Sequence, residues 1–186
     1  MKKEPIRVFE GFAGYGGASF GLKRSGLKYK VIGMSEFDKF ASDLLAQNFP
    51  GIKNWGDITK IEGDELPDFD LFTGGFPCQP FSVSGRRLGF NDTRGTLFHD
   101  IVRVAEARHP QYLLLENVPG LLNHDGGKTF GTILETIHEL GYGLEWQVLN
   151  SANFGVAQAR KRVFIVGFLR AECAGRILSF TDANPK

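Results

Sequence analysis

The sequence of 186 residues has only two cysteines, Cys78 and Cys173, which lie far apart in the chain. They do not have the spacing of a metal-binding motif, and a pair this sparse does not indicate a disulfide framework. The four histidines form no HxxH or HxxxH pair. We therefore predict a reduced protein without a metal site, for which the cytoplasm is the default location.

Long apolar runs and an excess of either charge are also missing. No segment is apolar over the length that a bilayer requires, and no signal peptide is visible, so we expect no membrane association. The net charge at pH 7 is only +1, so binding to nucleic acid would have to come from local basic loops. With 42% hydrophobic residues, the chain can form a globular core.

Apolar segments of strand length alternate with amphipathic segments of helix length. This alternation predicts an α/β fold with a doubly wound, mostly parallel sheet. The segments 144–150 and 162–169 are joined without room for a crossover helix, so the final strand should be antiparallel. We expect one domain over residues 1–170 and a tail over 171–186. The other predicted strands are 6–13, 29–36, 52–55, 68–75 and 111–118, and the predicted helices begin near residues 17, 39, 96 and 128.

Glycines and acidic residues fall where the first strands end, which is the edge at which such sheets bind ligands. A glycine-rich turn, Gly14–Gly17, follows the first strand and would let a ligand approach the backbone. Glu36 is placed to accept hydrogen bonds from ribose hydroxyls, and Asp57 to accept one from an adenine amino group. The alternatives are an ordinary βα turn and solvated acids. Ser19 stands where a dinucleotide fingerprint has its third glycine, so we favour an adenosine-type ligand over NAD.

The motif "GFPCQPFS" places Cys78 between Pro77 and Pro80, directly after a predicted strand. The prolines stiffen the loop, and nearby arginines favour the thiolate form of the cysteine. A buried, inert cysteine is the alternative, and we assign that role to Cys173.

Glu116 ends the apolar strand "YLLLEN", where its carboxylate would be partly desolvated and able to share or donate a proton. The alternative is a strand-end acid paired with an arginine. Two basic loops, residues 84–94 and 158–162, should emerge at the same edge as Cys78. Together they suit a polyanion, although a solvated run of charge is the simpler alternative.

From residue 6 to residue 168 the chain resembles the cytosine-C5 DNA methyltransferases of bacterial modification systems. The resemblance is carried by "FAGYGG", "SEFDKFA", "GDIT", "GFPCQPFS", "RGTLFHDI", "ENV" and "QARKR", in the family's order. It implies a Rossmann-like methyltransferase fold, the cofactor S-adenosylmethionine, and double-stranded DNA with a flipped-out cytosine as the substrate.

The resemblance also implies residue roles. Cys78 would be the nucleophile, and Glu116, Arg160 and Arg162 would hold the flipped cytosine. The implied DNA contacts are Ser82, Ser84, Arg86, Arg87, Arg94 and Gln158. The implied cofactor site consists of Phe12, Gly14, Tyr15, Gly16, Gly17, Glu36, Phe37, Asp57, Ile58, Pro77 and Leu97, with Phe37 stacked on the adenine.

Two alternative functions stay open beside DNA methylation. One is methylation of cytosine in tRNA, which one branch of this family performs, and the other is a catalytically silent cofactor-binding subunit. The presence of Cys78, Glu116 and both arginines argues against the silent subunit. The family normally continues with a target-recognition domain and a closing segment, and nothing in this sequence resembles them. We therefore expect the catalytic part of a split or truncated enzyme, completed by a second polypeptide.

Overall fold

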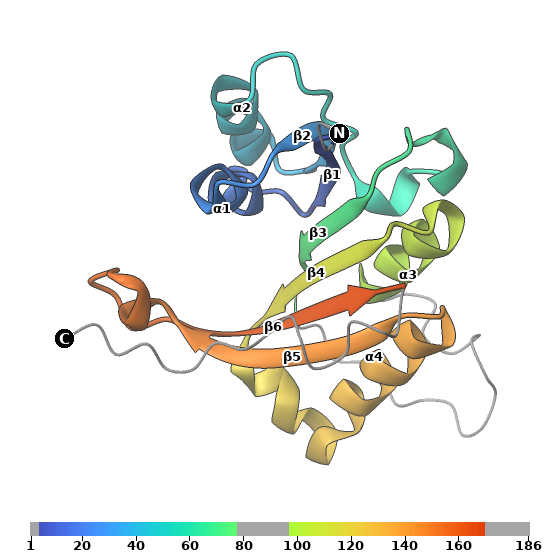
Figure 1. Cartoon of the computed structure of the whole chain (residues 1–186), viewed down its shortest axis with the longest axis vertical. Coiled ribbons are helices and arrows are strands. Elements are labelled where there is room, and N and C mark those ends of the chain that lie inside the picture. Colours follow the sequence, from blue (N-terminus) through green and yellow to red (C-terminus); the bar gives the residue numbers. More distant parts are fainter. Residues whose placement is uncertain (1–3, 78–96, 170–186) are drawn as a thin grey trace.

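The computed structural model of the chain describes residues 4–77 and 97–169, and it contains a six-stranded sheet in the order β2-β1-β3-β4-β6-β5 (Figure 1). The strands are β1 (Ile6–Gly11), β2 (Tyr29–Ser35), β3 (Leu71–Gly75), β4 (Tyr112–Asn117), β5 (Gly143–Asn150) and β6 (Lys161–Phe168).

The four strands β2, β1, β3 and β4 are parallel, whereas β6 runs antiparallel to both of its neighbours, β4 and β5. The short connection between β5 and β6 explains this reversal, because it contains only the turn η4 (Ser151–Phe154). The predicted fold class, including the antiparallel final strand, is therefore confirmed.

The helices cover both faces of the sheet. They are α1 (Gly17–Ser25), α2 (Lys39–Asn48), α3 (Leu97–Arg108) and α4 (Lys128–Glu139). Successive residues of a strand point to opposite faces. On β1, Phe9 packs into a large core cluster that includes residues of α3 and α4, whereas Glu10 contacts the start of α1 on the other face.

The two helical layers differ greatly in how much they bury. α3 buries five residues against the sheet and α4 buries four. In contrast, α1 buries only Ser19 and α2 buries only Leu45. α2 nevertheless begins where the sequence predicts, because the Asp38 side chain accepts a hydrogen bond from the Ala41 N–H at 2.8 Å.

One local prediction is wrong, and one element was not predicted. Residues 52–55 do not form a strand; they make one isolated bridge, between Met34 and Asn54, beside β2. Two backbone hydrogen bonds join Met34 to Lys53 and Trp55, and the Asn54 side chain bonds the backbone of Glu36 and the hydroxyl of Ser42. The turn η3 (Pro119–Gly127), which follows β4, was not predicted.

In the part of the chain that the structure describes, no helix has the length and apolarity needed to cross a membrane. The tail 171–186 lies outside the described residues.

Candidate active site

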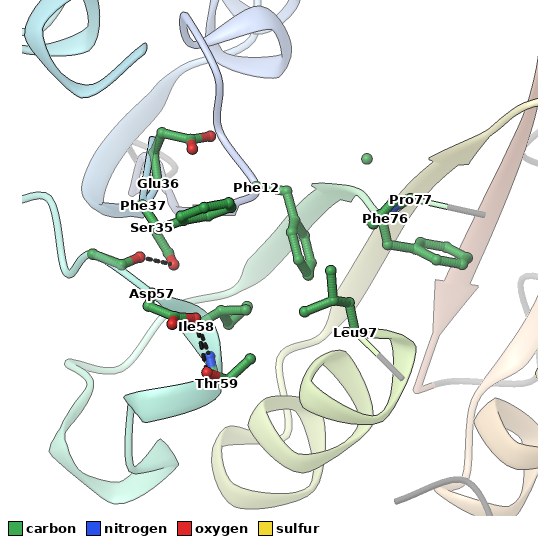
Figure 2. Close-up of a pocket in the computed structure, with 12 residues that line it drawn as sticks. Phe12, Ser35, Glu36, Phe37, Asp57, Ile58, Thr59, Phe76, Pro77 and Leu97 are labelled. Atoms are coloured by element: carbon green, nitrogen blue, oxygen red, sulfur yellow. Dashed lines mark hydrogen bonds between the residues drawn. The ribbon is translucent and has the colours of Figure 1, made fainter. Parts of the chain in front are cut away.

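The carboxyl ends of β1, β2 and β3, together with the start of α3, enclose a pocket of about 480 Å³ (Figure 2). This volume lies in the range of small-molecule sites. The pocket is lined by Phe12, Ser35, Glu36, Phe37, Gly56, Asp57, Ile58, Thr59, Gly75, Phe76, Pro77 and Leu97. All of these come from the strand-end positions, or lie beside them, where the sequence predicts a ligand.

Apolar side chains form most of the pocket wall. Figure 2 shows the rings of Phe12 and Phe37 projecting into the space near Leu97 and Ile58. Phe37 is 76% exposed, so one face of its ring is free to stack on a flat ligand. The wall therefore suits an aromatic ring system.

Glu36 lies at the end of β2 and connects three pieces of backbone. One carboxylate oxygen accepts the N–H of Gly14 at 2.8 Å, and the other accepts the N–H of Asp38 at 2.8 Å. Each oxygen has a further lone pair, so the carboxylate can also accept hydrogen bonds from ligand hydroxyls. The residue thus links the glycine turn, β2 and the start of α2.

Asp57 caps the short turn η1 (Ile58–Lys60) and is held by Thr59. Its carboxylate accepts the Thr59 N–H at 3.0 Å and the Thr59 hydroxyl at 2.8 Å. The hydroxyl hydrogen bond is the main reason that the pKa of Asp57 lies below its ordinary value. Asp57 is therefore an anionic acceptor at neutral pH, which suits a ligand amino group.

Ser35 and Thr59 also line the pocket, although neither was predicted as a site residue. The Ser35 hydroxyl donates to the carbonyl of Gly56 at 2.7 Å, which fixes the wall between β2 and Asp57. The spacing Asp-x-Thr is a turn signal that could have identified Thr59, whereas Ser35 follows an apolar strand without any such signal.

Four residues of the predicted cofactor site, all of them described, do not line the pocket: Gly14, Tyr15, Gly16 and Gly17. Tyr15 is 60% exposed, and its ring lies 6.4 Å from that of Phe20 on the outer side of α1. Gly16 packs so closely on Phe49 that no larger side chain would fit.

Glu116 and Arg162 form an ion pair beside the pocket. The Arg162 Nε lies 2.7 Å from the Glu116 Oε1, and their side chains are 19% and 32% exposed. Gly75, which lines the pocket, is the register partner of Glu116, and a Cβ on it would lie 3.1 Å from Glu116 Oε2. Hence the ion pair and the pocket lie on opposite sides of the end of β3.

Arg160 and Gln158 lie in the exposed loop between η4 and β6. Ser151 organises this loop, because its hydroxyl bonds the Gln158 carbonyl and accepts the Arg160 N–H at 3.1 Å. The structure therefore brings Arg162 to Glu116 but leaves the Arg160 side chain at the surface.

Several predicted residues lie outside the described part of the chain: Cys78, Ser82, Ser84, Arg86, Arg87 and Arg94. The residues just before Cys78 are well anchored. The buried Asn117 side chain donates to the carbonyl of Phe76 at 2.9 Å, where Pro77 can offer no backbone donor. Among the residues that the structure describes, no group of histidine, cysteine or acidic side chains could hold a metal ion.

Comparison with known proteins identifies relatives of similar sequence. The chain is 43% identical over 195 aligned positions to the type II methyltransferase M.NlaIV of Neisseria lactamica, an alignment that covers 98% of this chain and 45% of that protein. It is 47% identical over 183 positions to M.HgiCI of Herpetosiphon aurantiacus, covering 96% and 43%. The chain thus spans less than half the length of both relatives.

The fold matches solved methyltransferase structures. The crystal structure of the S. pombe Dnmt2 methyltransferase superposes with a TM-score of 0.72 at 25% identity, covering 88% of this chain and 51% of that chain. The family model for C-5 cytosine-specific DNA methylases matches residues 6–182. On this evidence the chain belongs to the C-5 cytosine-specific DNA methylase family.

Proposed function

We propose that this chain is the catalytic part of an S-adenosylmethionine-dependent DNA cytosine-C5 methyltransferase. The observation that carries the proposal is the arrangement at the end of β3. A pocket with an exposed ring and two carboxylates lies on one side, and the Glu116–Arg162 ion pair lies on the other. One strand end would therefore separate the cofactor from the base that it methylates.

The pocket fits the cofactor's adenosine. Phe37 would stack its ring on the adenine, and the Asp57 carboxylate would accept a hydrogen bond from the adenine amino group. The Glu36 carboxylate would accept hydrogen bonds from the ribose hydroxyls. The bound cofactor supplies an electrophilic methyl group. The chain's own residues fix where that group lies and exclude water from the apolar wall.

The residue types match the chemistry of cytosine C5, which is a poor nucleophile. Addition of the Cys78 thiolate to C6 forms an S–C6 bond and places electron density on C5. C5 would then take up the methyl group that the cofactor would supply when held by Glu36, Phe37 and Asp57. Loss of the C5 proton to a base returns electrons to the ring and breaks the S–C6 bond, which releases methylated cytosine and regenerates the thiolate.

Glu116 and Arg162 would orient the base during this sequence. The Glu116 carboxyl would face N3 and the exocyclic amino group of the base, where charge develops on thiolate addition. Arg162 holds that carboxyl in place through the 2.7 Å contact and can polarise the carbonyl O2. Arg160 and Gln158 on the exposed loop would meet the DNA.

The test is covalent trapping on double-stranded DNA that contains 5-fluorocytosine, by the chain assembled with a polypeptide that carries the recognition domain and closing segment. Fluorine at C5 is not lost as a proton, so the adduct with Cys78 should persist on a denaturing gel after methyl transfer. Cys78→Ser should form no adduct, and Cys173→Ser is the matched control that should trap normally. Trapping on tRNA but not on DNA would favour the tRNA alternative, and no trapping on either would favour a silent subunit.

We also propose that a second polypeptide completes the enzyme. The α1–α2 layer is thinly packed and carries exposed apolar side chains, namely Tyr15, Phe20, Phe37, Phe40 and Leu44. A surface of this kind favours a protein partner.

A methylation assay with tritiated cofactor tests the second proposal. The chain alone should carry out little or no sequence-specific methyl transfer to DNA, because phosphate contacts carry no sequence information. Addition of a polypeptide with the recognition domain and closing segment should restore sequence-specific transfer. Sequence-specific turnover by the 186-residue chain alone would refute the split-enzyme proposal.

A further inference from the structure

We propose that Glu10, which does not line the pocket, is a positioning residue for the cofactor, because it and Glu36 hold the glycine turn between β1 and α1 from its two sides. The inference rests on the proposed function only for the identity of the ligand. Its first readout is a property of the ligand-free chain.

The turn from residue 12 to residue 16 has a conformation that it would not hold by itself. Phe12, Gly14 and Gly16 all have positive φ angles, of 52°, 56° and 90°. A positive φ at a non-glycine residue such as Phe12 is energetically unfavourable, and it persists only where the surroundings enforce it. Phe12 also places its ring in the pocket, so the turn conformation shapes the binding wall (Figure 2).

Glu10 secures the α1 side of the turn. Its side chain is buried, with the residue 3% exposed, and its carboxylate accepts the N–H groups of Ala18 and Ser19, both at 3.0 Å, as well as the Ser19 hydroxyl. The N-cap of α1 is Gly16, which has no side chain to offer. A carboxylate from the preceding strand thus caps the helix, at the end where the helix dipole favours negative charge.

The β2 side of the turn is secured independently. Glu36 accepts the N–H of Gly14 at 2.8 Å, and the carbonyl of Ser35 accepts the N–H of Ala13 at 3.0 Å. Within the turn, the Gly16 N–H donates to the Ala13 carbonyl at 2.8 Å. Only a few residues separate the bond from Gly14 to Glu36 from the bonds of α1 to Glu10. Loss of the bonds to Glu10 should therefore also loosen the hydrogen bonds of Gly14 and Gly16.

The competing explanation is that Glu10 only caps α1. In that case its loss would affect the amides of Ala18 and Ser19 and would leave the turn unchanged. Propagation to Gly14 and Gly16, which Glu10 does not contact, is what separates positioning from capping.

The test is amide hydrogen exchange of the cofactor-free chain carrying Glu10→Gln. The amide side chain has one acceptor oxygen for three donors, so at least one buried bond is lost. We expect exchange at Gly14 and Gly16 to be about tenfold faster or more. Ile133→Val, a core change on α4, is the control: it should lower global stability without a selective effect at these two amides. If Glu10→Gln fails to fold, Ser19→Ala removes only the hydroxyl bond and should give a smaller effect at the same two amides.

The second readout is affinity for S-adenosylmethionine, measured by calorimetry on the chain assembled with its partner. Glu10→Gln should weaken binding about three- to tenfold, in line with the loss of one buried hydrogen bond. Faster exchange confined to Ala18 and Ser19, with unchanged affinity, would overturn the proposal. Faster exchange at Gly14 and Gly16 without any cofactor binding by the wild type would instead count against the proposed function alone.

Discussion

Arg162 and Glu116 form a charged contact whose two side chains are both partly exposed. Such a pair adds little to folding, and the role that we propose for it is to orient the base. Arg162→Ala would leave Glu116 without the group that orients it. We expect turnover by the assembled enzyme to fall about 100-fold or more, with cofactor affinity retained. Steady-state kinetics of the assembled enzyme provide the measurement.

The control for this change is Lys161→Ala, one residue earlier on β6, where the side chain is exposed. Lys161→Ala should leave turnover unchanged. Equal loss in both variants would show that the effect comes from positive charge near the DNA and not from the ion pair.

Thr59 acts on the pocket through Asp57. The Thr59 hydroxyl is the main cause of the lowered pKa of Asp57, so Thr59→Val should raise that pKa toward the ordinary value of 3.8. A carboxyl whose folded-state pKa is lowered stabilises the protein above its unfolded pKa, and this contribution disappears as the pH falls through the folded value. NMR titration of the Asp57 carboxyl carbon provides the measurement. Thr136→Val, which removes a hydroxyl bond within α4, should leave the titration unchanged.

At the level of elements, the start of β1 is tied to the start of β3 by Arg7 and Asp70. The Asp70 carboxylate accepts the Arg7 backbone N–H at 2.9 Å and two guanidinium N–H groups at 3.1 and 2.8 Å. The hydrogen bond from the Arg7 side chain is the main cause of the lowered pKa of Asp70. The tie therefore aligns the two strands whose far ends form the pocket.

Asp70→Asn should lower the free energy of unfolding at pH 7 by only about 0.5–1 kcal/mol, because the Arg7 side chain is 46% exposed and solvent screens the pair. The lowered pKa stabilises the fold above the unfolded pKa and ceases to do so as the pH falls through the lowered value. The difference between wild type and variant should accordingly shrink in acid. Denaturant unfolding at pH 7 and at a pH below the lowered pKa of Asp70 tests this. Asp64→Asn, at an exposed residue, is the control.

At the level of the whole molecule, burial is uneven. The α3–α4 side of the sheet is densely packed, whereas Phe40 on α2 is 81% exposed. Phe40→Ser should leave the chain's own unfolding unchanged, because Phe40 contributes little to its core. It should weaken association with the second polypeptide about tenfold, as expected where a buried aromatic anchor is lost. Tyr112→Ser, at the amino end of β4 away from the pocket, is the control in the same binding measurement.

The fold class and the edge that carries the site follow from the sequence. The alternation of apolar segments is a local signal, and so are the capping Asp38 and the short connection before β6. The carboxyl ends of parallel strands meet at one edge, so a glycine turn and acids at the ends of predicted strands predict a pocket without any tertiary information. Glu36 and Asp57 were identified in this way, whereas Phe37 was implied by the resemblance to the methyltransferase family.

The tertiary structure decided which side chains meet. The pairing of Arg162 with Glu116 depends on the register of β6 against β4. The exposed position of Tyr15 depends on how α1 packs. Neither is encoded in spacing along the chain. Nothing in the sequence distinguishes Glu10 from an ordinary acidic residue. In the structure its carboxylate caps α1, and burial raises its pKa. Local patterns specify elements because hydrophobic periodicity acts over a few residues, whereas contacts between distant residues depend on how those elements pack.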